Sequence, residues 1–312
     1  MRPPTWSPSP SALTWAGPDM PADGTAADAN SRGLELFRNY ERTGNLQVLQ
    51  EAITLFQKAV DATPAGHAYR PAYLTDLGTA LKTRFERTGQ QPDLDQAVTR
   101  LSEALDAIPA GQPDRAGTLT NLGNALRIRS ERTGRQADLD QAIATHREAV
   151  GATPAGHPSR PGYLSNLANA LGTRFRRTGR RADLDEAIRL FGEAVDATPA
   201  GHPDRPRLVA GLGNALGARF ELTGQRADLD RIITLFREAV DGTPAGHPFP
   251  APFPVRPRHR AADQARALRP LVSRTWRGGR LHPARGCLVQ LGTATRAAYT
   301  SGIRPYSLGR AT

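Results

Sequence analysis

Residues 75–88 read TDLGTALKTRFERT, and residues 165–178 read SNLANALGTRFRRT. Apolar residues lie three or four positions apart in the first stretch and again in the segment after it: Leu74, Leu77, Leu81 and Phe85, then Leu94, Ala97, Leu101 and Ala104. Such spacings place each set on one face of a helix. Residues 74–85 and 94–104 are therefore predicted to form two amphipathic helices that pair as a hairpin.

This motif belongs to a repeat with a period of 45 residues. Thr-Gly recurs at Thr43, Thr88, Thr133, Thr178 and Thr223, and Pro-Ala-Gly recurs at Pro64, Pro109, Pro154, Pro199 and Pro244. A constant period of about 20 to 50 residues is typical of a solenoid, in which each unit buries its apolar face on its neighbours. We expect an array over residues 31–248 with about five helix pairs, the first pair lacking the start of its first helix.

Local signals mark where the helices begin and end. Gly89 and Pro109 follow the first and second helix of a unit, and Pro71 lies near a start. Each second helix also carries an Asp followed three residues later by Gln or Glu: Asp93 with Gln96, Asp138 with Gln141, and Asp183 with Glu186. That spacing is typical of a capping box, so these Asp residues are predicted to accept a free backbone N–H. Behind Asp228 the third residue is Arg231, which leaves that box half formed.

The charge of the chain is concentrated in one segment. Of the 312 residues, 249–312 hold 12 Arg and one acidic residue, which accounts for the whole formal charge of +11. Residues 1–30, rich in Pro, Ala and Asp, are expected to be a disordered leader, and 249–312 an irregular Arg/Pro-rich tail. The sequence contains no run of about 18 apolar residues, so no membrane span is predicted. The single cysteine, Cys287, excludes a disulfide within the chain and favours a cytoplasmic setting.

The tail can also be interpreted as a repeat read in the wrong frame. Residues 255–268 lie in phase with 75–88, and a permitted set of codons for them, read one base later, encodes SDLGTALRTRLERS. We therefore expect a frameshift between about 247 and 255, with the frame restored near 285. In that case the missing neighbour would let residues 228–246 fray. The alternative is that the tail is authentic. In either case it is a polycation that attracts nucleic acid or anionic lipid nonspecifically.

Leu74, Leu77-Gly78, Leu81, Ala97, Leu101 and Pro109 together resemble the pattern of the tetratricopeptide family. The family unit has about 34 residues, so this version is longer and most resembles the arrays of actinobacteria that precede CHAT protease domains. The resemblance implies an all-α, right-handed α-solenoid. It also implies a non-catalytic scaffold or sensor that binds a protein or peptide in its concave groove. The alternatives are the truncated sensor half of a CHAT-type protease, or a nucleic-acid binder acting through the tail.

Polar residues on the outer face of each predicted first helix are candidate partner contacts. They are Thr79, Lys82, Asn124, Arg127, Asn169 and Asn214. An Asn side chain offers both a donor and an acceptor, so a ladder of Asn can pair with the backbone of an extended peptide. The alternative for any one of them is a solvated side chain or a bond between helices.

Histidine and arginine columns suggest structure rather than chemistry. His67, His157, His202 and His247 recur one per unit, too far apart to share a metal, and are predicted to form turns. His146 occupies a core position and is predicted to be hydrogen-bonded there. Arg84, Arg129, Arg174 and Arg219 are interpreted as a solvated column facing Glu86, Glu131 and Glu221. No catalytic motif is present, so we expect no enzyme, no cofactor and no metal.

Overall fold

The computed structural model describes residues 24–241, with side chains through residue 235. These residues form ten α-helices: α1 (Gly24–Thr43), α2 (Leu46–Asp61), α3 (Arg70–Thr88), α4 (Gln91–Ala107), α5 (Pro113–Thr133), α6 (Gln136–Gly151), α7 (Arg160–Thr178), α8 (Arg181–Asp196), α9 (Arg205–Thr223) and α10 (Arg226–Asp241). The all-α class predicted from the sequence is confirmed. The predicted frameshift, the tail and His247 lie outside the described residues.

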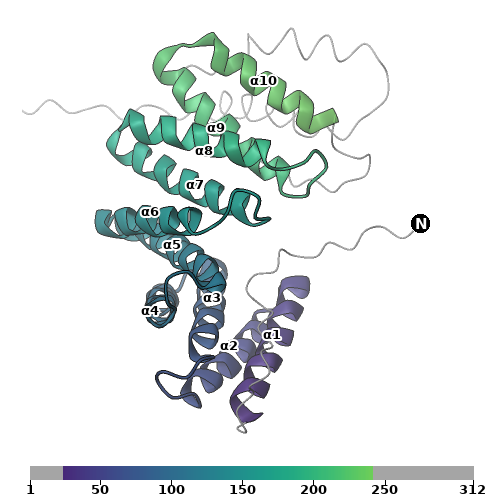
Figure 1. Cartoon of the computed structure of the whole chain (residues 1–312), viewed down its shortest axis with the longest axis vertical. Coiled ribbons are helices and arrows are strands. Elements are labelled where there is room, and N and C mark those ends of the chain that lie inside the picture. The colour runs from purple at the N-terminus through teal and green to yellow at the C-terminus, as the bar shows by residue number, and fades with distance from the viewer. Residues whose placement is uncertain (1–23, 242–312) are drawn as a thin grey trace, which may run out of the picture. The chain divides into compact units, whose positions relative to one another are not determined.

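The chain divides after Pro199 into two compact units. In the first unit the helices pair as hairpins, α1 with α2, α3 with α4, α5 with α6 and α7 with α8 (Figure 1). Each second helix also contacts the first helix of the next hairpin, and the first helices α1, α3, α5 and α7 contact one another in order. In the second unit α9 packs on α10. The predicted helical hairpins are therefore confirmed.

Glycine ends the first helices where the sequence predicts it. Gly89, Gly134 and Gly179 adopt left-handed φ angles of 71°, 77° and 72°. The N–H of Gly89 donates to the carbonyl of Phe85 at 2.7 Å, which satisfies one of the free carbonyls at the helix end. Proline lies in the first turn of α3, α7 and α9, where its missing N–H costs no helical bond.

The first helix begins earlier than expected. Helix α1 starts at Gly24, inside the segment 1–30 predicted to be a leader, so that boundary and the shortened first helix are both wrong. Ala26 and Ala29 are 9% and 7% exposed and belong to the core of the first hairpins. The segment is rich in Ala and Asp, which suggested disorder. In the structure the small residues form most of the narrow buried face of the helix, and most of the polar residues lie on its other faces.

Glycine within the first helices lets the paired helices approach closely. A Cβ atom built on Gly78 would lie 2.6 Å from Leu101 Cγ, and one on Gly33 would lie 2.7 Å from the Phe56 ring. One large residue of the second helix therefore fills the space that glycine leaves in the first. The glycine of the Leu-Gly pair thus has a packing role in these hairpins, whereas the fourth hairpin has the small residue Ala168 at this position.

His146 fills this same position against Gly123, but it is not hydrogen-bonded as predicted. The residue is fully buried, and both ring nitrogens lack a partner within the described residues. Burial, with a smaller contribution from the charge of Arg127, lowers the pKa of His146 to about 3. The prediction failed because His146 stands where the other hairpins have Phe or Leu, and no described group lies within hydrogen-bonding reach of its ring nitrogens.

A forked ion pair joins the two helices of each hairpin from α3 onward. Arg174 donates from Nε to Asp183 Oδ2 and from NH2 to Asp183 Oδ1, both at 2.8 Å. The same geometry joins Arg84 to Asp93, Arg129 to Asp138 and, in the second unit, Arg219 to Asp228. The Asp side chains are only 3% to 8% exposed, so these pairs are largely removed from water. We name this contact the arginine clasp.

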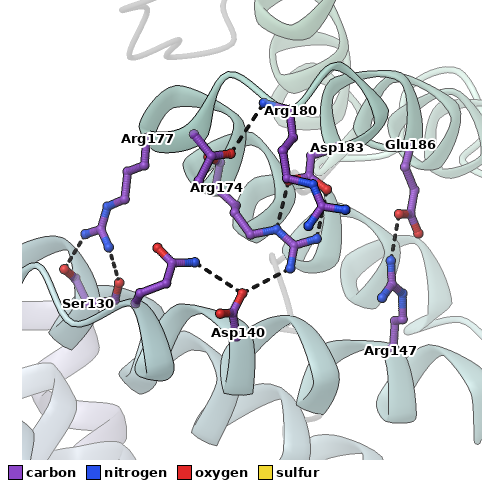
Figure 2. A network of polar contacts seen from close by, with 10 residues as sticks. Ser130, Asp140, Arg147, Arg174, Arg177, Arg180, Asp183 and Glu186 are labelled. Atoms are coloured by element: carbon purple, nitrogen blue, oxygen red, sulfur yellow. Dashed lines mark hydrogen bonds and ion pairs between the residues drawn. The ribbon is translucent and has the colours of Figure 1, made fainter.

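The clasp also reaches the preceding hairpin. The remaining guanidinium nitrogen, NH1, of Arg174 donates to Asp140 Oδ1 of α6 at 3.0 Å (Figure 2). Arg129 lies 3.6 Å from Asp95 of α4 in the same way, and Arg84 donates to Gln50 of α2. One arginine therefore holds three helices.

Two sequence interpretations are wrong at this contact. The Asp residues do not cap the second helices, because the N-cap positions are Gln90, Arg135 and Arg180 and none makes a side-chain capping bond. The Arg column is not solvated and does not face the Glu residues two positions later. The hydrogen bond to Asp183 instead raises the pKa of Arg174, against the opposing effect of burial.

The clasp predicts a large difference between two aspartate substitutions. Asp183→Ala leaves a largely buried guanidinium without its main partner and is expected to cost about 3 to 5 kcal/mol. Asp140→Asn removes only the exposed contact and is expected to cost less than about 1 kcal/mol. Chemical denaturation followed by circular dichroism measures both, and equal losses for the two variants would contradict the role assigned to the buried fork.

His146→Leu is expected to stabilise the protein, because Leu101 already fills the equivalent space. Removing two unpaired ring nitrogens should contribute about 1 to 3 kcal/mol at neutral pH. In the wild type, a histidine pKa lowered by folding means that stability is lost as pH falls below about 6.5. The advantage of the variant should therefore grow by about 2 kcal/mol between about pH 7.5 and pH 5. Denaturation curves at both pH values test this, and a constant difference between the proteins would refute it.

Candidate functional site

The predicted contact residues of the first unit lie on successive first helices. Thr79 and Lys82 are on α3, Asn124 and Arg127 on α5, and Asn169 on α7. Asn169 is exposed and the other four are half-buried. Because α3, α5 and α7 contact one another in order, these residues form one surface, which we name the amide face. The sixth predicted residue, Asn214, is exposed on α9 in the second unit.

The two cations of the amide face are neutralised within their own helices. Lys82 Nζ lies 2.9 Å from Glu86, and Arg127 NH1 lies 2.7 Å from Glu131, in each case one helical turn later. The Glu131 carboxylate also accepts from Thr173 of α7 at 3.1 Å. This surface therefore carries little net charge over α3 and α5.

Hydrogen bonds between first helices use some of the polar residues. Asn121, which the sequence analysis did not single out, donates from Nδ2 to Thr79 Oγ1 at 3.1 Å and so joins α5 to α3. The Thr79 hydroxyl itself donates to the carbonyl of Thr75 at 2.8 Å. Thr79 thus takes part in a hydrogen bond between helices, which is the alternative to a partner contact stated above for these residues.

Asn124 and Asn169 differ from Thr79. Within the described residues, neither side chain hydrogen-bonds to another protein group. They occupy the same position in consecutive repeats, so two free amides point outward at neighbouring places on the layer of first helices. Each offers one acceptor and two donor hydrogens to a partner.

A desolvated carboxyl lies beside the amide face at the second repeat. Asn30 of α1, 8% exposed, donates from Nδ2 to Asp76 Oδ2 of α3 at 3.1 Å, while its own Oδ1 is buried without a partner among the described residues. Burial raises the pKa of Asp76 to about 7, against the opposing effects of Asn30 and Arg38. Asn121 and Asn166 occupy the equivalent position in the next two repeats.

A second arginine column was missed from the sequence. Arg70 and Arg160 each donate to one carbonyl near the end of the preceding second helix and to one just after it. These are the carbonyls of Val60 and Thr63 for Arg70, and of Val150 and Thr153 for Arg160. Arg115 contacts Leu105 and Ile108 in the same way. The recurrence of Arg every 45 residues at these positions was the available signal.

The histidines of the loops form turns as predicted. The Nδ1 atoms of His67, His157 and His202 accept the backbone N–H two residues later, at 3.2, 3.1 and 3.1 Å. Among the residues described, no group of three or more His, Cys, Asp or Glu side chains is arranged to hold a metal ion. In the same part of the chain, no helix has the length and apolar character needed to cross a bilayer.

Two surface hollows lie away from the amide face. One of about 580 Å³ is lined mainly by α8, with Arg189, Gly192 and Glu193 among its residues. The other, about 500 Å³, is lined mainly by α2, with Ile53 and Gln57 among its residues. None of the six predicted contact residues lines either hollow.

Comparison with known proteins finds a family match for two of the repeats. The family model for the tetratricopeptide repeat matches residues 115–159 and 162–204. No curated protein matches the sequence. Among solved structures, one similar protein is assigned as a kinesin light chain of Podosopora anserina and is built of nearly identical TPR-like repeats. Its sequence identity to this chain is 19% and the TM-score is 0.50. The match covers 68% of this chain and 97% of that protein. A variant of those repeats with one substitution is 18% identical, with a TM-score of 0.53 over 69% and 96%.

A thermophilic TPR protein of Thermus thermophilus is also similar. It is 15% identical, covers 71% of this chain and 93% of its own, and has a TM-score of 0.46. At such low identities, the similarity to the kinesin light chain repeats shows a shared fold alone.

Asp76→Asn is expected to stabilise the protein above neutral pH. A carboxyl whose pKa is raised by folding binds more protons in the folded state, so wild-type stability falls as pH rises from about 4 to 7 and is constant above. The amide carries no charge and can donate to the unpaired Asn30 Oδ1. We expect a gain of about 1 to 2 kcal/mol at about pH 8, after allowance for partial exposure, and a smaller gain at about pH 5. Denaturation at the two pH values measures it, and a gain independent of pH would contradict the assignment.

Proposed function

Because residues 115–159 and 162–204 are tetratricopeptide repeats, we propose that this chain is a non-catalytic scaffold or sensor module that binds an extended segment of a partner protein along the amide face. Solenoids of stacked hairpins offer long surfaces of this kind. The observation that carries the proposal is the pair of free amides, Asn124 and Asn169, at equivalent positions of α5 and α7.

The chemistry of the amide face favours recognition of a backbone over recognition of charge. Lys82 and Arg127 are each held by a glutamate of the same helix, so neither offers an unpaired charge to a carboxylate ligand. An extended peptide presents N–H and C=O groups along its length, and an amide side chain pairs with both. The specificity of the interaction then depends on the neighbouring side chains rather than on one charged anchor.

The hydrogen bond between Asn121 and Thr79 supports the same proposal. It joins α5 to α3, and the bond from Thr173 to Glu131 joins α7 to α5, so the helices that carry the two free amides are held in place before a ligand binds. A rigid row of amides loses less conformational entropy on binding than a mobile one, which strengthens the complex. The scaffold contributes positioning, and any chemistry belongs to its partner.

Substitution of the two free amides tests the proposal directly. Peptides selected from a random phage-displayed library on the wild-type chain should bind Asn124→Ala/Asn169→Ala about 10- to 100-fold more weakly, since each lost hydrogen bond is worth about 1 kcal/mol. Fluorescence anisotropy with the labelled peptides measures the affinities.

A matched control changes two amides on the second helices. Gln57 and Gln91 are engaged with Asp61 and Asp95 of their own helices, so Gln57→Ala/Gln91→Ala should leave affinity unchanged. Equal affinity of the selected peptides for the wild type and the amide-face variant would overturn the proposal.

A further inference from the structure

Positive charge gathers at two neighbouring turns between helices. Residues 176–182 read RRTGRRA and carry four arginines and no acid, while residues 131–137 read ERTGRQA. In the two preceding turns, residues 41–47 and 86–92, one Glu and one Arg cancel. The concentration is therefore local, because residues 1–248 as a whole hold equal numbers of basic and acidic groups.

The two turns lie side by side. Arg177 of α7 donates from NH1 to Ser130 Oγ of α5 at 2.7 Å, and Figure 2 shows it reaching across to that helix. Arg176 NH2 lies 3.9 Å from Glu131, the first residue of the neighbouring turn. We name the surface formed by residues 131–137 and 176–182 the basic edge.

Three arginines of the basic edge have no side-chain partner in the described part of the chain. The side chains of Arg135, Arg180 and Arg181 are exposed and contact no acid or acceptor there. Three acids around the edge are already engaged, since Asp183 and Asp140 are held by Arg174 and Glu131 by Arg127. The folded chain therefore leaves these guanidinium groups uncompensated.

The composition of the edge indicates which partner fits it. The two turns contain no aromatic side chain and, apart from Ala137 and Ala182, no apolar one, so they lack the buried anchors on which protein interfaces depend. Arginine matches a phosphate group with two parallel hydrogen bonds. We infer that the basic edge binds the phosphate backbone of a nucleic acid, without reading its bases.

This surface is distinct from the Arg-rich segment 249–312. It belongs to the described repeats, and most of its positive charge comes from the four arginines at the end of α7 and the start of α8. It is also distinct from the amide face, so a partner protein and a nucleic acid can be bound by different residues.

Neutralising the three unpaired arginines tests the inference in the full chain. Arg135→Gln/Arg180→Gln/Arg181→Gln should bind a labelled oligothymidylate of about 20 nucleotides with a salt dependence smaller by about 2 in the slope of log K against log salt, because each phosphate contact contributes about 0.7. At low salt the affinity should fall about tenfold. Thermal unfolding should be unchanged, since these side chains make no contact in the described fold.

A control with the same loss of charge separates the edge from net charge. Arg100, Arg147 and Arg189 lie on the second helices and pair with Glu103, Glu186 and Glu193, and their triple replacement by Gln should keep the wild-type slope. If both variants change the slope equally, binding reflects net charge and the inference fails. If poly-glutamate binds as tightly as the oligonucleotide and responds equally to the edge variant, the partner is a carboxylate polymer and the nucleic-acid assignment is wrong.

Discussion

Each hairpin of this chain leaves an apolar face open until the next hairpin covers it. The close approach of paired helices at positions such as Gly78, which faces Leu101, sets the distance between the two helices of a hairpin. Polar groups are then placed to fit that spacing. The guanidinium of Arg174 reaches Asp183 in its own hairpin and Asp140 in the one before only because both helices are held at that distance. The arginine clasp thus depends on the packing of the helices. Within the first unit it also fixes the orientation of a hairpin relative to the preceding one.

The same constraint decides which surfaces remain for partners. The first helices use one side to contact the second helices, and their neighbours along the array cover their flanks. The side chains left outward include Asn124 and Asn169, whose amides the described fold does not use. At the ends of the first helices, the turns project beyond the packed region, so their composition can vary without disturbing the core. The two proposed surfaces therefore offer different side chains to a partner, the amides of Asn124 and Asn169 in one and the arginines of the turns in the other.

Periodic features could be predicted from the sequence, whereas features that depend on a distant partner could not. Leu74, Leu77 and Leu81 predict their helix because apolar residues spaced three and four positions apart are typical of an amphipathic α-helix. Asp183 was assigned to a cap because a capping box and an acceptor for a distant arginine look alike in sequence. The helix start three residues earlier removes the N-cap geometry, and the clasp uses the carboxylate instead. For His146, periodicity identified the core position, but the lack of a hydrogen-bond partner among the described residues is a tertiary fact. The free amides were found because they share a position across repeats, although only the structure separates them from Thr79.

The fourth repeat shows how one change can serve both surfaces. Repeats two and three carry a cation and a glutamate one turn apart on the first helix, Lys82 with Glu86 and Arg127 with Glu131. In the fourth repeat the equivalent positions hold Gly172 and Arg176. Glycine removes a long side chain beside Asn169 and leaves that amide more exposed than Asn124. Arg176 replaces the glutamate of the two earlier repeats and adds its positive charge to the basic edge. The loss of one ion pair thus opens the amide face and charges the turn at the same place in the array.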